Sequence, residues 1–171
     1  MYRFVIVLSF MLVITPVQAE EQPKIFSMRS LSVDLASKAA WGAIEDCRKR
    51  GYSVAVSVVD RGGNMQVLLR DRFAGPHTPG TAKAKAWTAN SFRQGTGVLA
   101  ELLQKGTIPS QVQHNPGALL VGGGELIESQ GELIGAIGVS GAPPGKSERD
   151  SIDGACALAG IEAIRENLEF D

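Results

Sequence analysis

Two short apolar runs separated by a glycine-rich turn constrain this chain more than any other feature. Residues 54–59 read Val-Ala-Val-Ser-Val-Val, and residues 65–69 form a second run, Met-Gln-Val-Leu-Leu. β-Branched runs of this length are typical of strands. The intervening Asp60-Arg61-Gly62-Gly63-Asn64 is rich in turn-forming residues. The pattern predicts a β-hairpin and therefore an antiparallel sheet.

Helical periodicity is found before and after this hairpin. The first predicted helix begins near Ser32, which can cap it, and ends at Gly51. Its apolar residues recur every four positions along one face: Leu35, Ala39, Ala43 and Cys47. Two further helices are predicted after the hairpin, at residues 81–93 and 98–104.

The C-terminal half predicts more strands and a last helix. Residues 118–121, 125–128 and 133–140 form two or three strand segments, and Ser147 caps the helix with Asp150 in the capping-box position. Amphipathic helices need a sheet face on which to bury their apolar stripes. We therefore expect an α+β fold with an antiparallel sheet of about five strands and flanking helices.

The N-terminus predicts export. Arg3 precedes an apolar run at residues 4–14, and small or modest side chains lead up to Ala19, which is typical of a signal peptide cleaved after Ala19. An uncleaved anchor is the alternative, although the run is shorter than the roughly 20 residues that span a bilayer. We expect a periplasmic or secreted protein without a stable membrane anchor. The expected organisation is a signal peptide at 1–19, an extension at 20–30 and one domain at 31–171.

Charge and cysteine content narrow the possibilities further. The net charge is −1 and the isoelectric point is near 6.1, which argues against a nucleic-acid partner. Cys47 and Cys156 both fall on predicted amphipathic helices among small apolar neighbours. This setting favours two buried thiols. A disulfide between them is the alternative, and an oxidising compartment permits it.

The glycine-rich segments do not match nucleotide-binding motifs. Gly122-Gly123-Gly124 is followed by an expected strand and lacks both the third glycine and the Lys-Ser/Thr of such motifs. No nucleophile elbow or metal-ligand spacing is visible either. Gly135, Gly138 and Gly141 recur inside or beside a strand, which indicates a ligand, a subunit contact or a closely packed helix.

The most informative loop runs from Arg70 to Gly80. His77 lies in a Gly-Pro-His-Thr-Pro context, so prolines restrict the backbone and hold the imidazole at a fixed angle. An ordinary surface loop is the alternative. The nearby side chains that suit an acidic planar ligand are two aromatic and four basic residues: Phe73, Trp87, Arg70, Arg72, Lys83 and Lys85.

Several motifs, taken in order, resemble one family. They are Val56-Ser57-Val58-Val59-Asp60-Arg61-Gly62-Gly63-Asn64, Ala74-Gly75-Pro76-His77-Thr78, Ala82-Lys83-Ala84-Lys85-Ala86-Trp87-Thr88-Ala89, Gly123-Gly124 and Ile134-Gly135-Ala136-Ile137-Gly138-Val139-Ser140-Gly141. Over roughly residues 31–167 the chain resembles the HbpS/GlcG family of haem-binding proteins, which is related to the C-terminal domain of PduO-type corrinoid adenosyltransferases. It departs from the family at Glu125-Leu126, where relatives commonly have a proline before the aliphatic residue.

The resemblance implies a profilin-like fold, a homo-oligomer and haem as cofactor. It implies iron ligation by His77 or Thr78, and imidazole is the stronger iron ligand. Arg72, Lys83 and Lys85 would contact the propionates of the tetrapyrrole.

We therefore expect an exported haem-binding protein in haem or iron storage or sensing, a binding protein more than an enzyme. One alternative is a periplasmic enzyme or accessory factor that degrades haem or assists small-molecule oxidation. A second is an oligomeric structural protein without a cofactor.

Overall fold

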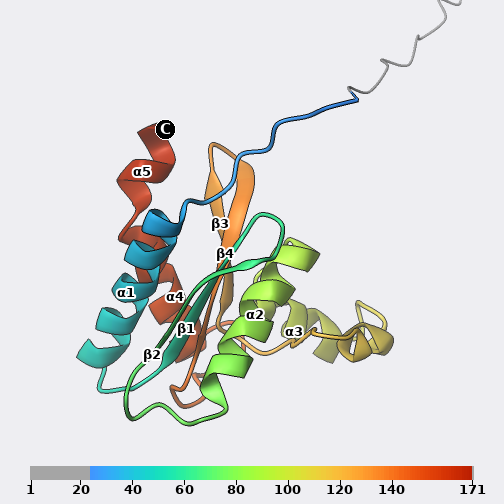
Figure 1. Ribbon diagram of the computed structural model, residues 1–171. Helices are drawn as coiled ribbons and strands as arrows, with labels where there is room; N and C mark the ends of the chain where they lie inside the picture. Colours follow the sequence, from blue (N-terminus) through green and yellow to red (C-terminus); the bar gives the residue numbers. More distant parts are fainter. Residues whose placement is uncertain (1–23, 171) are drawn as a thin grey trace, which may run out of the picture.

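The structure, a computed structural model, describes residues 24–170, which form a sheet between two layers of helices (Figure 1). The four strands are antiparallel in the order β2-β1-β4-β3. They are β1 (Ala55–Asp60), β2 (Met65–Arg70), β3 (Gly124–Ser129) and β4 (Glu132–Ser140). The predicted hairpin is β1–β2, and the predicted α+β class is confirmed.

Helices cover both faces of the sheet (Figure 1). One face carries α1 (Val33–Lys49), α4 (Ile152–Glu162) and the short α5 (Arg165–Phe170). The other carries α2 (Thr78–Phe92), followed along the chain by α3 (Thr96–Gln104) and a 3₁₀ helix, η1 (Ser110–His114). The first predicted helix is confirmed, with the Ser32 hydroxyl accepting the Leu35 N–H at its start. The helix expected from residue 81 begins earlier, at Thr78.

The two sheet faces carry different cores because side chains alternate along each strand. Val56 and Val58 belong to the larger core beneath α1 and α4, whereas Val59 joins a smaller core with alanines of α2. At Gly138 an added Cβ would lie 2.2 Å from the Ala82 carbonyl oxygen. This glycine therefore permits the close packing of α2 on β4, one of the three interpretations of the strand glycines.

The expectation of two free buried thiols is wrong, because Cys47 of α1 and Cys156 of α4 form a disulfide with a Cα–Cα distance of 5.5 Å. Small residues let these helices approach closely. A Cβ at Gly160 would lie 2.5 Å from the Ala39 carbonyl oxygen, and one at Gly42 would lie 2.8 Å from the Ala163 Cβ. The spacing between the helices, which the sequence pattern does not reveal, brings the two sulfur atoms together.

The expectation of about five strands is not confirmed, since the sheet formed within residues 24–170 has four. Residues 118–121 do not form a strand. Their backbone groups bond to helix side chains instead: the Leu119 N–H donates to Thr88 Oγ1, and the Val121 carbonyl accepts from Thr96 Oγ1. These bonds tie the segment to α2 and α3.

The last long helix starts later than expected. Its cap is Ser151, whose hydroxyl accepts the Gly154 N–H, and not Ser147. The Ser147 hydroxyl instead accepts the Asp150 N–H at 3.1 Å. The Ser-x-x-Asp pattern thus forms a local turn ahead of α4 instead of a capping box.

The N-terminal segment joins the sheet near its edge. The Leu31 N–H donates to the Ile134 carbonyl, and an Arg29 Nη donates to Ser129 Oγ. The predicted signal peptide, with its cleavage site after Ala19, lies outside the described residues. Within residues 24–170, no helix is long and apolar enough to cross a membrane.

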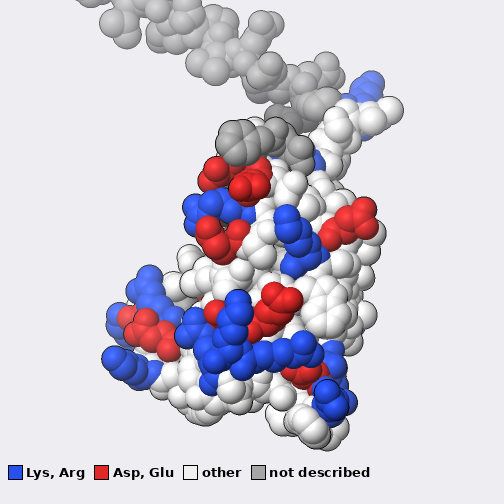
Figure 2. Space-filling view, turned by 90° about the vertical axis from the view of Figure 1, so that its left-hand side faces the viewer, with Lys and Arg blue, Asp and Glu red and all other residues white. Residues whose placement is uncertain are grey.

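Charges of both signs are interleaved on the side of the molecule shown in Figure 2. Two arginines at the end of α1 pair with carboxylates: Arg48 with Asp71 and Arg50 with Asp46, each at 2.6 Å. Hydrogen bonds from Arg48 hold the pKa of the Asp71 carboxyl below its usual range. These arginines therefore form ion pairs at the surface of the fold.

Candidate functional site

A cavity of about 480 Å³ lies beside α2, at the sequence-predicted loop and helix. Residues of α2 contribute one wall, and the β1–β2 turn and the loop after η1 contribute the others. The lining residues are Gly63, Asn64, Met65, Gly80, Lys83, Ala84, Trp87 and Gly117. Cavities of this size are typical of small-molecule sites.

The indole of Trp87 forms a flat apolar wall of this cavity. It lies between two glycines of positive φ, Gly63 (81°) and Gly117 (86°). An added Cβ would lie 3.4 Å from Trp87 Cδ1 at Gly63 and 3.6 Å from the six-membered ring at Gly117. These distances are ordinary contacts, so the positive φ of Gly63 and Gly117 is the reason that glycine is favoured at both positions beside the indole.

His77 stands at the beginning of the same side of α2. It is the residue before the helix, its imidazole makes no capping hydrogen bond, and it is exposed. Its carbonyl accepts the Thr81 N–H, as in a helical turn. Spacings of three and four place His77, Gly80, Ala84 and Trp87 along one face of a helix. His77 is not among the residues that line the cavity, and its exposed imidazole lies over Gly75, where an added Cβ would be 2.7 Å from the His77 Cε1 atom.

Two basic side chains accompany the imidazole and the indole. Lys83 is exposed and lines the cavity. Arg72 is exposed in the preceding loop, with its guanidinium 5.4 Å from the centre of the Phe73 ring. Phe73 is 81% exposed. Arg72 and Phe73 do not line the cavity, whereas Lys83 places a cation beside the indole of Trp87, a chemistry suited to a flat ligand that carries carboxylates.

Lys85 and Thr78 are buried, whereas the predicted site would need both side chains at the surface. Lys85 is buried and pairs with Asp153 at 2.9 Å. Thr78 is also buried, and its hydroxyl donates to the Gly75 carbonyl at 2.8 Å. Lys85 belongs to the alanine face of α2, so helical periodicity was the signal for its burial. The contribution of Gly117 to the cavity has no comparable signal in the sequence.

Glu125 of β3 carries a partly buried carboxyl, and the sequence marks it only as a departure from the family pattern. Its side chain lies against Gly95 and Gly154, where added Cβ atoms would come within 2.8 Å and 3.5 Å of its carboxylate oxygens. Burial raises the pKa of Glu125 from 4.5 to about 7. The folded protein therefore binds this proton more tightly than the unfolded chain does.

This pKa shift predicts a fall in stability as the pH rises from about 4.5 to about 7. In that window the unfolded chain has released the Glu125 proton and the folded chain still holds it. A Glu125→Gln variant should lack this pH dependence. Above pH 7 its free energy of unfolding should exceed that of the wild type by up to about 3 kcal/mol. Urea unfolding at several pH values measures the difference. Parallel curves would contradict the prediction, and Glu128→Gln, on the exposed side of β3, is the control.

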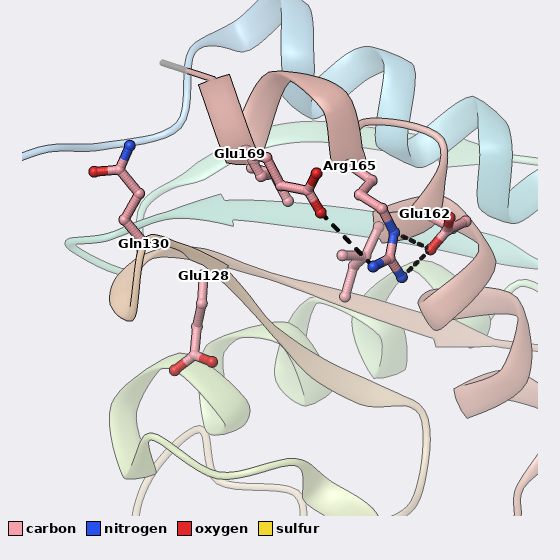
Figure 3. A pocket seen from close by; sticks show the side chains of 7 residues that line it. Glu128, Gln130, Glu162, Arg165 and Glu169 are labelled. Carbon is pink, nitrogen blue, oxygen red and sulfur yellow. Dashed lines mark hydrogen bonds and ion pairs between the residues drawn. The ribbon is translucent and has the colours of Figure 1, made fainter.

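A second cavity, of about 390 Å³, lies between the β3–β4 turn and the C-terminal helices (Figure 3). Its Arg165 bonds to Glu162 and Glu169, while Glu128 points away from that group. These charges satisfy one another at the surface. Among residues 24–170, no group of three His, Cys, Asp or Glu side chains converges as a metal site.

Comparisons with known proteins identify the family. Residues 31–162 match the sequence model described as "Haem degrading protein HbpS-like". The chain therefore belongs to the HbpS-like family, which confirms the resemblance.

Solved structures agree with this assignment. The crystal structure of a Streptomyces reticuli HbpS double mutant is 35% identical, covers 89% of this chain and 98% of its own, and superposes with a TM-score of 0.74. A PduOC:Heme complex is 29% identical, covers 79% of this chain and 95% of its own, and has a TM-score of 0.67. Protein GlcG of Escherichia coli K12 is 30% identical over 110 residues, 64% of this chain and 81% of GlcG.

Proposed function

We propose that this protein binds haem in the cavity beside α2 that Trp87 and Lys83 line, with His77 as the axial iron ligand. The observation that carries the proposal is an exposed histidine at the start of α2, the helix whose Trp87 and Lys83 line the cavity. The family description and a relative crystallised as a haem complex support it.

The residues present fit this cofactor. The indole of Trp87 offers an apolar wall for a porphyrin face, and Lys83 and Arg72 offer cations for its propionates. His77 provides a nitrogen ligand, and Pro76 and Pro79 restrict the backbone that holds it. Bound haem would supply an iron centre for ligand binding or redox chemistry. Neither Lys85 nor Thr78 is part of the proposed site.

Titration of the protein with hemin tests the proposal. We expect a sharpened Soret band that saturates at about one haem per chain, and a His77→Ala variant that binds at least about tenfold more weakly because it lacks the axial nitrogen. His114→Ala, at an exposed histidine of η1, is the matched control and should titrate like the wild type. A wild-type spectrum equal to that of free hemin would overturn haem binding. Normal binding by His77→Ala would overturn the ligand assignment.

Haem degradation is the second candidate function, favoured by the family description. Adding a reductant to the haem-loaded protein, with catalase present to remove peroxide, would then abolish the Soret band and release iron. A stable band would leave a role in haem or iron storage or sensing.

We further propose that the protein is exported after cleavage behind Ala19 and assembles into a homo-oligomer. The disulfide supports an oxidising compartment. Exposed apolar side chains on and after the edge strand β2 support assembly: Met65, Leu68 and Phe73. Mass determination of the mature protein and light scattering test the two statements. An intact residue 1 would contradict cleavage, and a monomer mass would contradict assembly.

A further inference from the structure

A buried ion pair lies at a cavity on the other side of α2. Lys85 Nζ is 2.9 Å from Asp153 Oδ2, and the two side chains are 3% and 10% exposed. Both residues line a cavity of about 430 Å³, together with Gly122, Gln104 of α3 and the loop at residues 142–148. This cavity shares no lining residue with the one beside Trp87.

The hydrogen bonds of the pair leave a donor available. An ammonium group carries three N–H donors. Lys85 Nζ donates one to Asp153 and one to the Val139 carbonyl at 3.0 Å. Both Asp153 oxygens already accept, one from Lys85 and one from the Ala142 N–H at 3.0 Å. The pair therefore retains capacity for one more acceptor.

Glycines bring the backbone tightly around this pair. A Cβ at Gly123 would lie 3.0 Å from Lys85 Nζ and 2.7 Å from the Asp153 Cβ. A Cβ at Gly122 would lie 2.0 Å from the Glu148 carbonyl oxygen. The Gly122 N–H donates to Glu148 Oε2 at 2.6 Å, which holds the loop against the triplet. Gly122 thus forms part of the wall of this cavity, and Gly123 packs against the ion pair.

Two further features favour an anion here. The cavity includes Ser151 and Asp153, where α4 begins, so the positive end of this helix dipole lies at the cavity. Lys146 contributes a second cation from the exposed loop. The carboxylates of Asp153 and Glu148 line the same cavity and limit the negative charge that it accepts.

We propose that this cavity binds a small monocarboxylate, whose oxygen accepts the remaining N–H of Lys85. The two lysines and the two protein carboxylates at the cavity balance one another, so the single negative charge of a carboxylate is easier to accommodate than the higher charge of phosphate. The cavity is large enough for such a ligand with a short polar substituent. The proposal is independent of haem binding.

Sodium acetate is a suitable probe in a ¹H–¹⁵N NMR titration, compared with sodium chloride at the same ionic strength. We expect saturable shifts at the amides of Gly122, Gly123, Ala142 and Asp153 with acetate alone. A Lys85→Met/Asp153→Leu variant removes the pair without leaving a single buried charge, and should bind acetate at least about tenfold more weakly. Lys49→Met, at the exposed end of α1, is the control and should bind acetate normally.

Three results would overturn the proposal. They are equal shifts with chloride, undiminished acetate binding by the folded double variant, and tighter binding of inorganic phosphate than of acetate. If the double variant does not fold, Gln104→Trp provides the test from an exposed position at the cavity. Its indole should block entry and weaken acetate binding, and unchanged binding would then count against the site.

Discussion

Removing the disulfide between Cys47 and Cys156 is expected to lower the free energy of unfolding by about 4–5 kcal/mol. The two cysteines are 109 positions apart, so the bond restricts most of the unfolded domain. Both side chains are fully buried between α1 and α4. Replacing them with alanine also removes some packing, which acts in the same direction.

Urea unfolding of the wild type and of Cys47→Ala/Cys156→Ala, with and without dithiothreitol, measures this effect. The reductant should destabilise the wild type and leave the double variant unchanged, which separates the covalent bond from the packing. A wild type whose unfolding midpoint does not change under full reduction would contradict the prediction. Free-thiol titration of each sample verifies that the bond has been reduced.

Replacing Lys85 alone with methionine is expected to cost about 3–5 kcal/mol of stability. The change leaves the Asp153 carboxylate, 10% exposed, without its cation. The Lys85→Met/Asp153→Leu variant should recover most of this loss, because it replaces the pair with apolar side chains of similar size.

A double-mutant cycle with Lys85→Met, Asp153→Leu and the combined variant measures the coupling between the two residues. We expect both single variants to be less stable than the combined one. Additive losses would contradict a direct pairing. Lys83→Met, from an exposed position two residues away, should change stability by no more than about 0.5 kcal/mol.

The parts of the fold that were predicted correctly depend on local signals. The periodicity from Ser32 to Gly51 and the turn between β1 and β2 each act over a few residues. Residues 118–121 are as apolar as a strand, yet the side chains of Thr88 and Thr96 bond their backbone. Competition between these side chains and a neighbouring strand for the same backbone groups depends on distant residues and leaves no local sequence pattern.

For the candidate site, too, the sequence indicated only those residues whose signals are local. The loop chemistry pointed to His77 and Lys83, and both are exposed on or beside α2. The burial of Lys85 depends on where Asp153 lies, 68 positions later in the chain. The bond between the two cysteines likewise depends on the distance between two helices. Both features result from packing between distant segments.

The strand order has a consequence for how quickly the chain folds. Each hairpin, β1–β2 and β3–β4, pairs neighbouring segments and can form early. The centre of the sheet instead joins β1 to β4, whose paired residues are 75 to 85 positions apart. The entropy of closing that long loop is lost before the central contacts repay it. Docking of the two hairpins is therefore the expected slow step, and substitutions at the β1–β4 seam should slow folding more than those at either sheet edge.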